Sequence, residues 1–243
     1  MAQIDNSNTF IAVDFDPPRG CLIEIDLKNP ARVRSVFSDP KSDVLTCIAR
    51  KFSYSTFAAL LKEHVEGNRE GQFKYSVMEF VIGRDDNIRE TRRSALNVLS
   101  QKCGHGSICE LSIGHLLVTN AVFQNVYLLS DRNPPRPLKI PQNINENTEE
   151  HIHSSMAVIN EPVPTGAKEL IVLPFWKEKE IVFYSLGERD LIQYRSITID
   201  MNPFETLWIP GRETLLVSQS GKSRSLRLFR FEQNWNLCGF NLD

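Results

Sequence analysis

Short β-prone segments separated by turn-forming residues recur along this chain of 243 residues. In residues 21–27, CLIEIDL, the odd-numbered positions are apolar, whereas Glu24 and Asp26 are charged. This period-two alternation is typical of a β-strand with one covered face. Turn formers flank the segment, with Asp-Pro-Pro-Arg-Gly before it and Lys-Asn-Pro after it. Residues 10–13 and 31–37 have similar strand character, so the three segments predict an antiparallel meander.

The same pattern returns in groups of four segments, in which the second is apolar on both faces and the outer ones alternate or become polar. A strand buried on both faces has a continuous apolar run. The predicted strands of these groups are residues 108–112, 115–121, 125–131 and 135–141, then 151–159, 169–176, 180–186 and 191–199, and finally 205–210, 214–219, 225–231 and 236–242. We place the second strands near Phe10, Val44, Leu116, Leu170 and Leu215, and the last spacings suit a repeat of roughly 40 to 50 residues.

One stretch interrupts the pattern between Val44 and Leu116. Residues 55–66 place apolar side chains at helical spacing, with Ser55 as the N-cap and Gly67 as the end. We therefore expect a helical insertion at 55–67, followed by a strand at 74–83. Residues 87–99 fit either an outer strand with a connection or a second helix, and we favour the strand.

Two polar segments, residues 1–8 and 143–150, lie outside the predicted strands. The first group has only three clear strands, because residues 1–8 are too polar to supply a convincing fourth. Residues 143–150, NINENTEE, are polar and without periodicity, which predicts a loop between two groups.

With this strand pattern, the sequence resembles a divergent β-propeller in the broad sense that includes WD-repeat proteins. Gly104-His105, followed by Gly114 and the strands at 115–121 and 125–131, is similar to a WD-type blade, although no Trp-Asp dipeptide occurs in the chain. The resemblance implies an all-β fold with about five four-stranded blades in a single domain over 1–243, as an incomplete ring or part of a larger propeller. It also implies a rigid scaffold used mainly for protein contacts, although fold alone does not decide function.

Four potential metal ligands, Cys103, His105, Cys109 and His115, form the densest such group in the chain. Thiolate and imidazole suit tetrahedral zinc, but the spacing lacks the paired ligands of common zinc modules. We therefore interpret them as core cysteines and turn histidines, and predict no metal and no cofactor. His151 and His153 are interpreted as polar residues near a loop.

An arginine-rich group, a Gly-Lys-Ser triplet and the three tryptophans are further candidates for functional sites. Arg84, Arg89, Arg92 and Arg93, with Arg50-Lys51 before them, resemble a patch that binds phosphate or nucleic acid, but Asp85, Asp86 and Glu90 dilute their charge, which favours a solvated face. Gly221-Lys222-Ser223 lacks the first glycine of a phosphate loop and precedes a strand rather than a helix, which predicts a hairpin turn. Among the three tryptophans, we assign Trp208 to the core, whereas Trp176 and Trp235 fit packing or a partner contact equally well.

Composition limits the partners and the compartment. A formal net charge of −2 predicts no general attraction to nucleic acid or anionic membranes. The sequence has no run of roughly 20 apolar residues and no signal-peptide pattern. The five scattered cysteines suit a reducing compartment, so we expect an intracellular protein in the cytoplasm, with the nucleus as the alternative.

Our leading hypothesis is a non-enzymatic module that binds another protein, because no catalytic motif accompanies the repeated strands. The alternative is a propeller-fold, metal-dependent hydrolase or lactonase with a site in the central channel; catalytic residues are not assigned. A third possibility is an α+β protein in which residues 55–66 and 87–99 are both helices.

Overall fold

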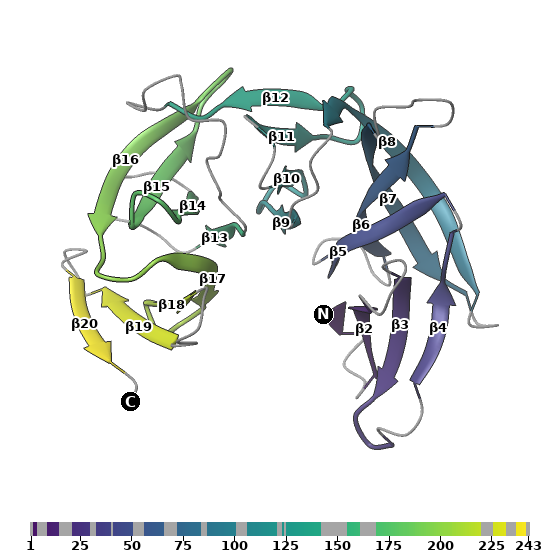
Figure 1. The fold of residues 1–243 in the computed structure, drawn as a ribbon, viewed down its shortest axis with the longest axis horizontal. Helices are drawn as coiled ribbons and strands as arrows, with labels where there is room; N and C mark the ends of the chain where they lie inside the picture. The colour runs from purple at the N-terminus through teal and green to yellow at the C-terminus, as the bar shows by residue number, and fades with distance from the viewer. Residues whose placement is uncertain are drawn as a thin grey trace. The chain divides into compact units, whose positions relative to one another are not determined.

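The computed structural model describes residues 2–3, 9–14, 21–29, 33–39, 41–50, 56–65, 72–83, 87–100, 106–120, 123, 125–141, 155–160, 169–219, 226–231 and 237–241. These residues form five antiparallel sheets of four strands each, and in every sheet the strands lie side by side in chain order (Figure 1). No helix occurs among them, and none of them therefore belongs to a helix able to span a membrane. The all-β prediction is confirmed, and the α+β alternative is wrong for this part of the chain.

Sheet 1 begins at the N-terminal end and has four strands rather than three. The strands are β1 (Ala2–Gln3), β2 (Thr9–Asp14), β3 (Cys21–Asp26) and β4 (Val33–Phe37). Ala2 and Gln3 pair with Ile11 and Phe10 of β2. The expectation that residues 1–8 contribute no strand is wrong, because an edge strand needs only backbone hydrogen bonds and not an apolar side chain.

Sheet 2 contains the largest departure from the sequence prediction. Its strands are β5 (Ser42–Ala49), β6 (Thr56–His64), β7 (Phe73–Ile82) and β8 (Ile88–Ser100). Residues 55–66 therefore hold a strand, not a helical insertion. Phe57 and Leu61 pack in one core cluster with Ile11 of sheet 1, whereas the alternate residue Leu60 approaches Gly106 of β9. A strand buried on both faces needs a continuous apolar run, and such a run also satisfies the helical spacing.

Two further corrections concern strands next to β6. Val44 lies in β5, so it belongs to the first strand of its sheet and not to the second. The preferred strand for residues 87–99 is confirmed, but it is one strand of 13 residues without a separate connection. Its partner β7 is paired with it from Phe73 to Ile82, with two register shifts.

The remaining sheets follow the predicted groups. Their strands are β9 (Gly106–Glu110), β10 (Leu116–Asn120), β11 (Asn125–Leu129) and β12 (Arg136–Lys139) in sheet 3; β13 (Ala157–Ile159), β14 (Leu170–Phe175), β15 (Glu180–Leu186) and β16 (Leu191–Thr198) in sheet 4; and β17 (Pro203–Ile209), β18 (Thr214–Gln219), β19 (Leu226–Phe231) and β20 (Leu237–Asn241) in sheet 5. The predicted loop at 143–150 lies outside the described residues.

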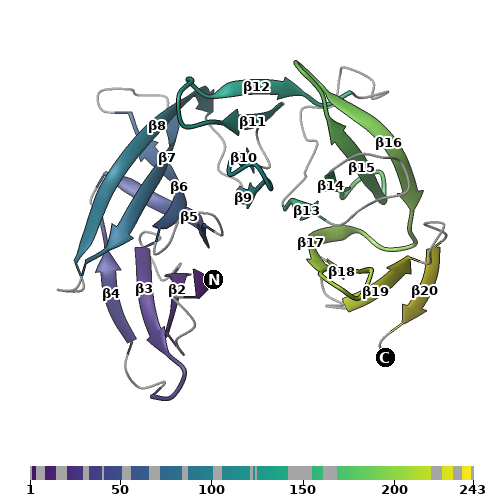
Figure 2. The same cartoon turned by 180° about the vertical axis from the view of Figure 1, so that it is seen from behind.

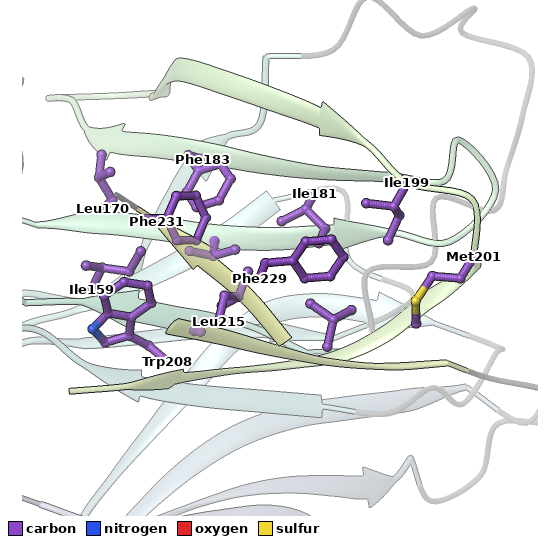
Figure 3. Packing of buried hydrophobic residues seen from close by; sticks show 13 residues of the cluster. Ile159, Leu170, Ile181, Phe183, Ile199, Met201, Trp208, Leu215, Phe229 and Phe231 are labelled. Atoms are coloured by element: carbon purple, nitrogen blue, oxygen red, sulfur yellow. The ribbon is translucent and has the colours of Figure 1, made fainter. Parts of the chain in front are cut away.

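The chain forms two compact units, which we describe separately. The first contains Met1–Glu110, Gly114–Val118 and Tyr127–Arg136, and the second contains the rest of the chain. In the second unit, β17 lies beside β13 and β14, and Figure 2 shows the same neighbours from behind. Trp208, Phe229 and Phe231 of sheet 5 point toward Phe183 and other apolar residues of sheet 4 (Figure 3). The assignment of Trp208 to the core is confirmed, since it is 7% exposed.

Candidate functional site

The structure describes only part of the group of potential metal ligands Cys103, His105, Cys109 and His115. Cys109 lies on β9 and is half-buried, and His115 lies just before β10 with its Nδ1 buried and without a hydrogen-bond partner among the described residues. Cys103 and His105 lie outside those residues. Within the described ranges, no three side chains from His, Cys, Asp and Glu are close enough together to hold a metal ion.

Several other candidates fall outside the described residues. They are Lys51, Arg84, Asp85, Asp86, His151, His153, Gly221-Lys222-Ser223 and Trp235. The strands on either side of the glycine triplet do pair antiparallel, with Ser218 opposite Leu226, so β19 rather than a helix follows the triplet. Trp176 is half-buried in the turn after β14, where its carbonyl accepts a hydrogen bond of 3.2 Å from Asn202.

Arg50 is buried in an ionic network and is not part of a surface patch. Its Nε donates to Glu110 at 2.9 Å, its Nη1 donates to Glu79, and its Nη2 donates to the carbonyl of Gly114. The side chains of Arg50, Glu79 and Glu110 are 8%, 9% and 2% exposed. Burial alone would lower the pKa of Arg50, but the two carboxylates outweigh it and hold the pKa above its ordinary value. This network joins sheets 2 and 3 and occupies the guanidinium of Arg50 with partners from the protein itself.

Arg92 and Arg93 are also engaged by carboxylates. Arg92 lies 3.7 Å from Glu79 and donates to the carbonyl of Ser130 at 2.9 Å. Arg93 pairs with Glu90 at 2.8 Å and with Glu63 at 2.9 Å, and its hydrogen bonds to Glu90 raise its pKa. Arg50, Arg92 and Arg93 are therefore paired with carboxylates, and the solvated face expected from the sequence does not describe Arg50, whose side chain is 8% exposed.

A second polar cluster, formed by Asp43, Lys62, His64 and Phe73, lies at one end of sheet 2. Asp43 is the second residue of β5, Lys62 and His64 end β6, and Phe73 begins β7. Asp43 pairs with Lys62 and His64 pairs with Phe73 across the strands, so all four side chains share one face of the sheet. We call this group the Asp43 cluster.

The inner part of the Asp43 cluster is a buried ion pair. Lys62 Nζ lies 2.7 Å from Asp43 Oδ2, and the two side chains are 11% and 13% exposed. The same Nζ lies 4.6 Å from the centre of the Phe73 ring, within the range of a cation–π contact. Asp43 Oδ1 is buried and accepts no hydrogen bond from the described residues. The cluster therefore contains a buried acceptor that no described residue satisfies.

The outer part of the Asp43 cluster is His64. Its side chain is 52% exposed, and its Nε2 lies 4.0 Å from Asp43 Oδ2. Its ring packs edge-on against Phe73 with a centroid distance of 4.9 Å. The His64 amide also donates a hydrogen bond to the carbonyl of Lys41, in the turn before β5. In the same turn, the Ser42 hydroxyl donates to Asp39, and this hydrogen bond lowers the pKa of Asp39. The solvent-accessible imidazole of His64 thus lies beside the buried ion pair of Asp43 and Lys62.

Sequence reasoning missed the Asp43 cluster because it placed Lys62 and His64 on a helix. On a strand, two residues separated by one position share a face, so the motif Lys-Glu-His would have indicated a joint site. The partner Asp43 follows only from the register between β5 and β6.

The comparisons with known proteins concern the fold. No family model matches the chain, and no curated protein matches it. Among solved structures, virginiamycin B lyase from Staphylococcus aureus is 9% identical, with 99% of this chain and 68% of that chain covered and a TM-score of 0.57. A protein from Lactobacillus plantarum is 12% identical, with 99% and 69% covered and a TM-score of 0.56. The luciferin-regenerating enzyme is 9% identical, with 95% and 76% covered and a TM-score of 0.56.

At these identities the likeness concerns the fold and not the activity. None of the comparisons identifies WD repeats in the chain. Together with the five four-stranded sheets, the solved structures show that this chain has a β-propeller-type fold.

Proposed function

We propose that this protein is a propeller-fold enzyme of the hydrolase or lyase class, which acts on a small polar molecule at the Asp43 cluster. The observation that carries the proposal is an exposed imidazole, His64, beside a buried carboxylate with one unused oxygen, Asp43 Oδ1. Two proteins of similar fold are enzymes by name, virginiamycin B lyase and the luciferin-regenerating enzyme, which makes an enzyme a reasonable expectation for this chain.

The chemistry assigned to the cluster is acid–base chemistry. Histidine is the side chain best suited to transfer protons near neutral pH. For a lactone, His64 takes a proton from water, the water oxygen bonds to the carbonyl carbon, the ring C–O bond breaks, and the leaving oxygen receives the proton. Asp43 Oδ2 lies 4.0 Å from His64 Nε2, where its carboxylate stabilises the imidazolium that forms when His64 takes the proton. Metal dependence is not part of the proposal, because the described residues bring no ligand set together.

The test is turnover of a panel of lactones and esters by the purified protein. His64→Gln removes proton transfer at an exposed position, and we expect kcat to fall by about 10² or more with little change in KM. Lys74→Gln is the matched control, because Lys74 is exposed on the neighbouring strand β7 and should leave the rate unchanged. If the panel is turned over equally by wild type and His64→Gln, the proposed site is wrong; if nothing is turned over, the proposed class is wrong.

A protein-binding role, the leading hypothesis from the sequence, stays a prediction. Exposed apolar side chains that suit such a role lie on several sheets, with Leu99 61% exposed on sheet 2 and Leu207 59% and Leu226 49% exposed on sheet 5. Exposed apolar patches of this kind often mark contact surfaces.

A further inference from the structure

Within the second unit, sheet 5 has one face buried against sheet 4 and an opposite face whose leucines are exposed or half-buried, which we call the open face. Trp208, Leu215 and Phe229 face sheet 4 and are 7%, 0% and 6% exposed. Figure 3 shows these three side chains within the buried cluster, and because side chains alternate along a strand, the residues between them lie on the opposite face. There Leu207, Leu216 and Leu228 are direct cross-strand neighbours and form a row across β17, β18 and β19.

This open face differs from the corresponding faces of sheet 4. On β14 and β15, the residues of both faces are buried: Val172 and Phe183 on one side, and Leu173 and Tyr184 on the other, are all at most 1% exposed. By contrast Leu207 is 59% exposed, Leu226 is 49% exposed, and Leu216 and Leu228 are only half-buried. An apolar sheet face of this composition is normally covered by a second layer.

The charges around the leucine row show what kind of layer fits. Glu205 precedes Leu207 by two residues on β17, and Arg230 follows Leu228 by two residues on β19, so the two exposed charges lie at diagonally opposite corners of the face. Two copies can stack face to face around a two-fold axis that lies in the plane between them, along the diagonal that does not join Glu205 to Arg230. This axis places Glu205 of each copy opposite Arg230 of the other. The same axis brings Leu216 onto its own counterpart. The face is therefore complementary to itself, as an isologous dimer requires.

We propose that this protein forms a two-fold symmetric dimer through the open face of sheet 5, with the leucine row at its centre and two Glu205–Arg230 pairs at its rim. A strand spacing of ~4.8 Å and a rise of ~3.3 Å per residue give this face an area of a few hundred Å². Standard interfaces bury ~800 Å² on each partner. The dimer is accordingly weak and concentration-dependent, and its strength comes mainly from the apolar row.

Sedimentation velocity over a series of protein concentrations tests the proposal, with circular dichroism to verify the fold of each variant. Wild type should move from monomer to dimer as its concentration rises. Leu207→Lys and the charge reversals Glu205→Arg and Arg230→Glu should each raise the dissociation constant by about tenfold or more. All three positions are exposed or at the edge of the sheet, so folding should be retained. The control Ile192→Lys, at a position 57% exposed on β16, should leave the dimer unchanged.

The double variant Glu205→Arg with Arg230→Glu is the decisive measurement, because it restores opposite charges at both corners. Recovery of dimerisation in the double variant supports the two-fold arrangement. A protein that stays monomeric at every concentration overturns the proposal. A dimer that is insensitive to Leu207→Lys, a double variant without recovery, or open-ended growth into larger species also overturns it.

Discussion

Two junctions between neighbouring sheets, one in each unit, are held together by different chemistry. In the first, sheets 2 and 3 are joined by a buried arginine, Arg50, between Glu79 and Glu110. In the second, sheets 4 and 5 are joined by an apolar cluster. The centre of the Phe231 ring lies 5.6 Å from that of Phe183 and 5.9 Å from that of Trp208. An ion pair between the same two sheets, Arg227–Asp200, is at the surface, since the Asp200 side chain is 74% exposed.

This difference affects how each junction tolerates change. An apolar junction loses stability in proportion to the volume removed, and its parts can adjust. A buried ionic junction depends on each partner, because removal of one charge leaves the other buried without compensation. The same strand pattern is thus compatible with two junctions of very different sensitivity.

Replacement of Arg50 should have the largest effect on stability. Arg50→Ala takes the guanidinium away from two buried carboxylates, Glu79 and Glu110, and Arg92 at 3.7 Å offsets only part of the charge of Glu79; we expect it to lower the free energy of unfolding by about 3 to 5 kcal/mol. Urea unfolding followed by circular dichroism measures the change. Arg89→Ala is the control, since Arg89 is exposed on β8 and should change stability by less than about 0.5 kcal/mol.

The triple variant Arg50→Met, Glu79→Leu, Glu110→Leu makes the first junction apolar, like the second. We expect it to recover most of the stability that Arg50→Ala loses, because no uncompensated charge remains. A triple variant as unstable as Arg50→Ala would show that the junction depends on the hydrogen bond from Arg50 to Gly114 rather than on charge balance.

Alkaline pH should weaken the first unit before the second. Burial raises the pKa of the Cys47 thiol from its ordinary value of 9.0 to about 11. The folded protein thus retains the proton, so this contribution is complete below about pH 9 and is lost as the pH rises toward 11. A shift of this size corresponds to about 2 to 3 kcal/mol. Burial also raises the pKa of Tyr184 in the second unit, but from a higher ordinary value of 10.0.

Unfolding free energies of wild type and Cys47→Ala at pH 8 and pH 10.5 measure this contribution. We expect the wild type to lose about 2 kcal/mol more than the variant over this interval, because only the wild type must keep a buried thiol protonated. Equal losses in the two proteins would mean that Cys47 is accessible to solvent in the folded state.

Sequence patterns predicted the strands well where one face is polar. The predicted range 21–27 exceeds β3 by one residue, and residues 191–199 exceed β16 by one residue, because alternation fixes both the type and the length of such strands. The pattern failed at residues 55–66, where both faces of β6 are buried and helix and strand give the same apolar spacing. The local sequence does not contain the deciding factor, which is contact with sheets on both sides.

The polar clusters were harder to predict than the fold. Glu79 is a single carboxylate within the apolar run of residues 75–82, and a buried carboxylate requires a cation, but the sequence does not indicate that this cation is Arg50. The Asp43 cluster depends on the β5–β6 register, so the error at residues 55–66 concealed it as well. Sites formed across strands can be predicted only after the strands are paired correctly.

The smallest expected effects compare two turns with the same unusual backbone. Gly114 in the first unit has a φ of 78°, and Lys179 in the second has a φ of 53°. This left-handed conformation costs an L-residue roughly 1 kcal/mol but is free of strain in glycine. Lys179→Gly should therefore raise the unfolding free energy by about 0.5 to 1 kcal/mol, and Gly114→Ala should lower it by about 1 kcal/mol. A Cβ at Gly114 meets nothing closer than Arg50 Nη2 at 3.9 Å, so the backbone conformation alone accounts for the second change. Thermal unfolding of both variants measures the pair, and a decrease for both would mean that the Lys179 side chain makes a contact that outweighs its strained backbone.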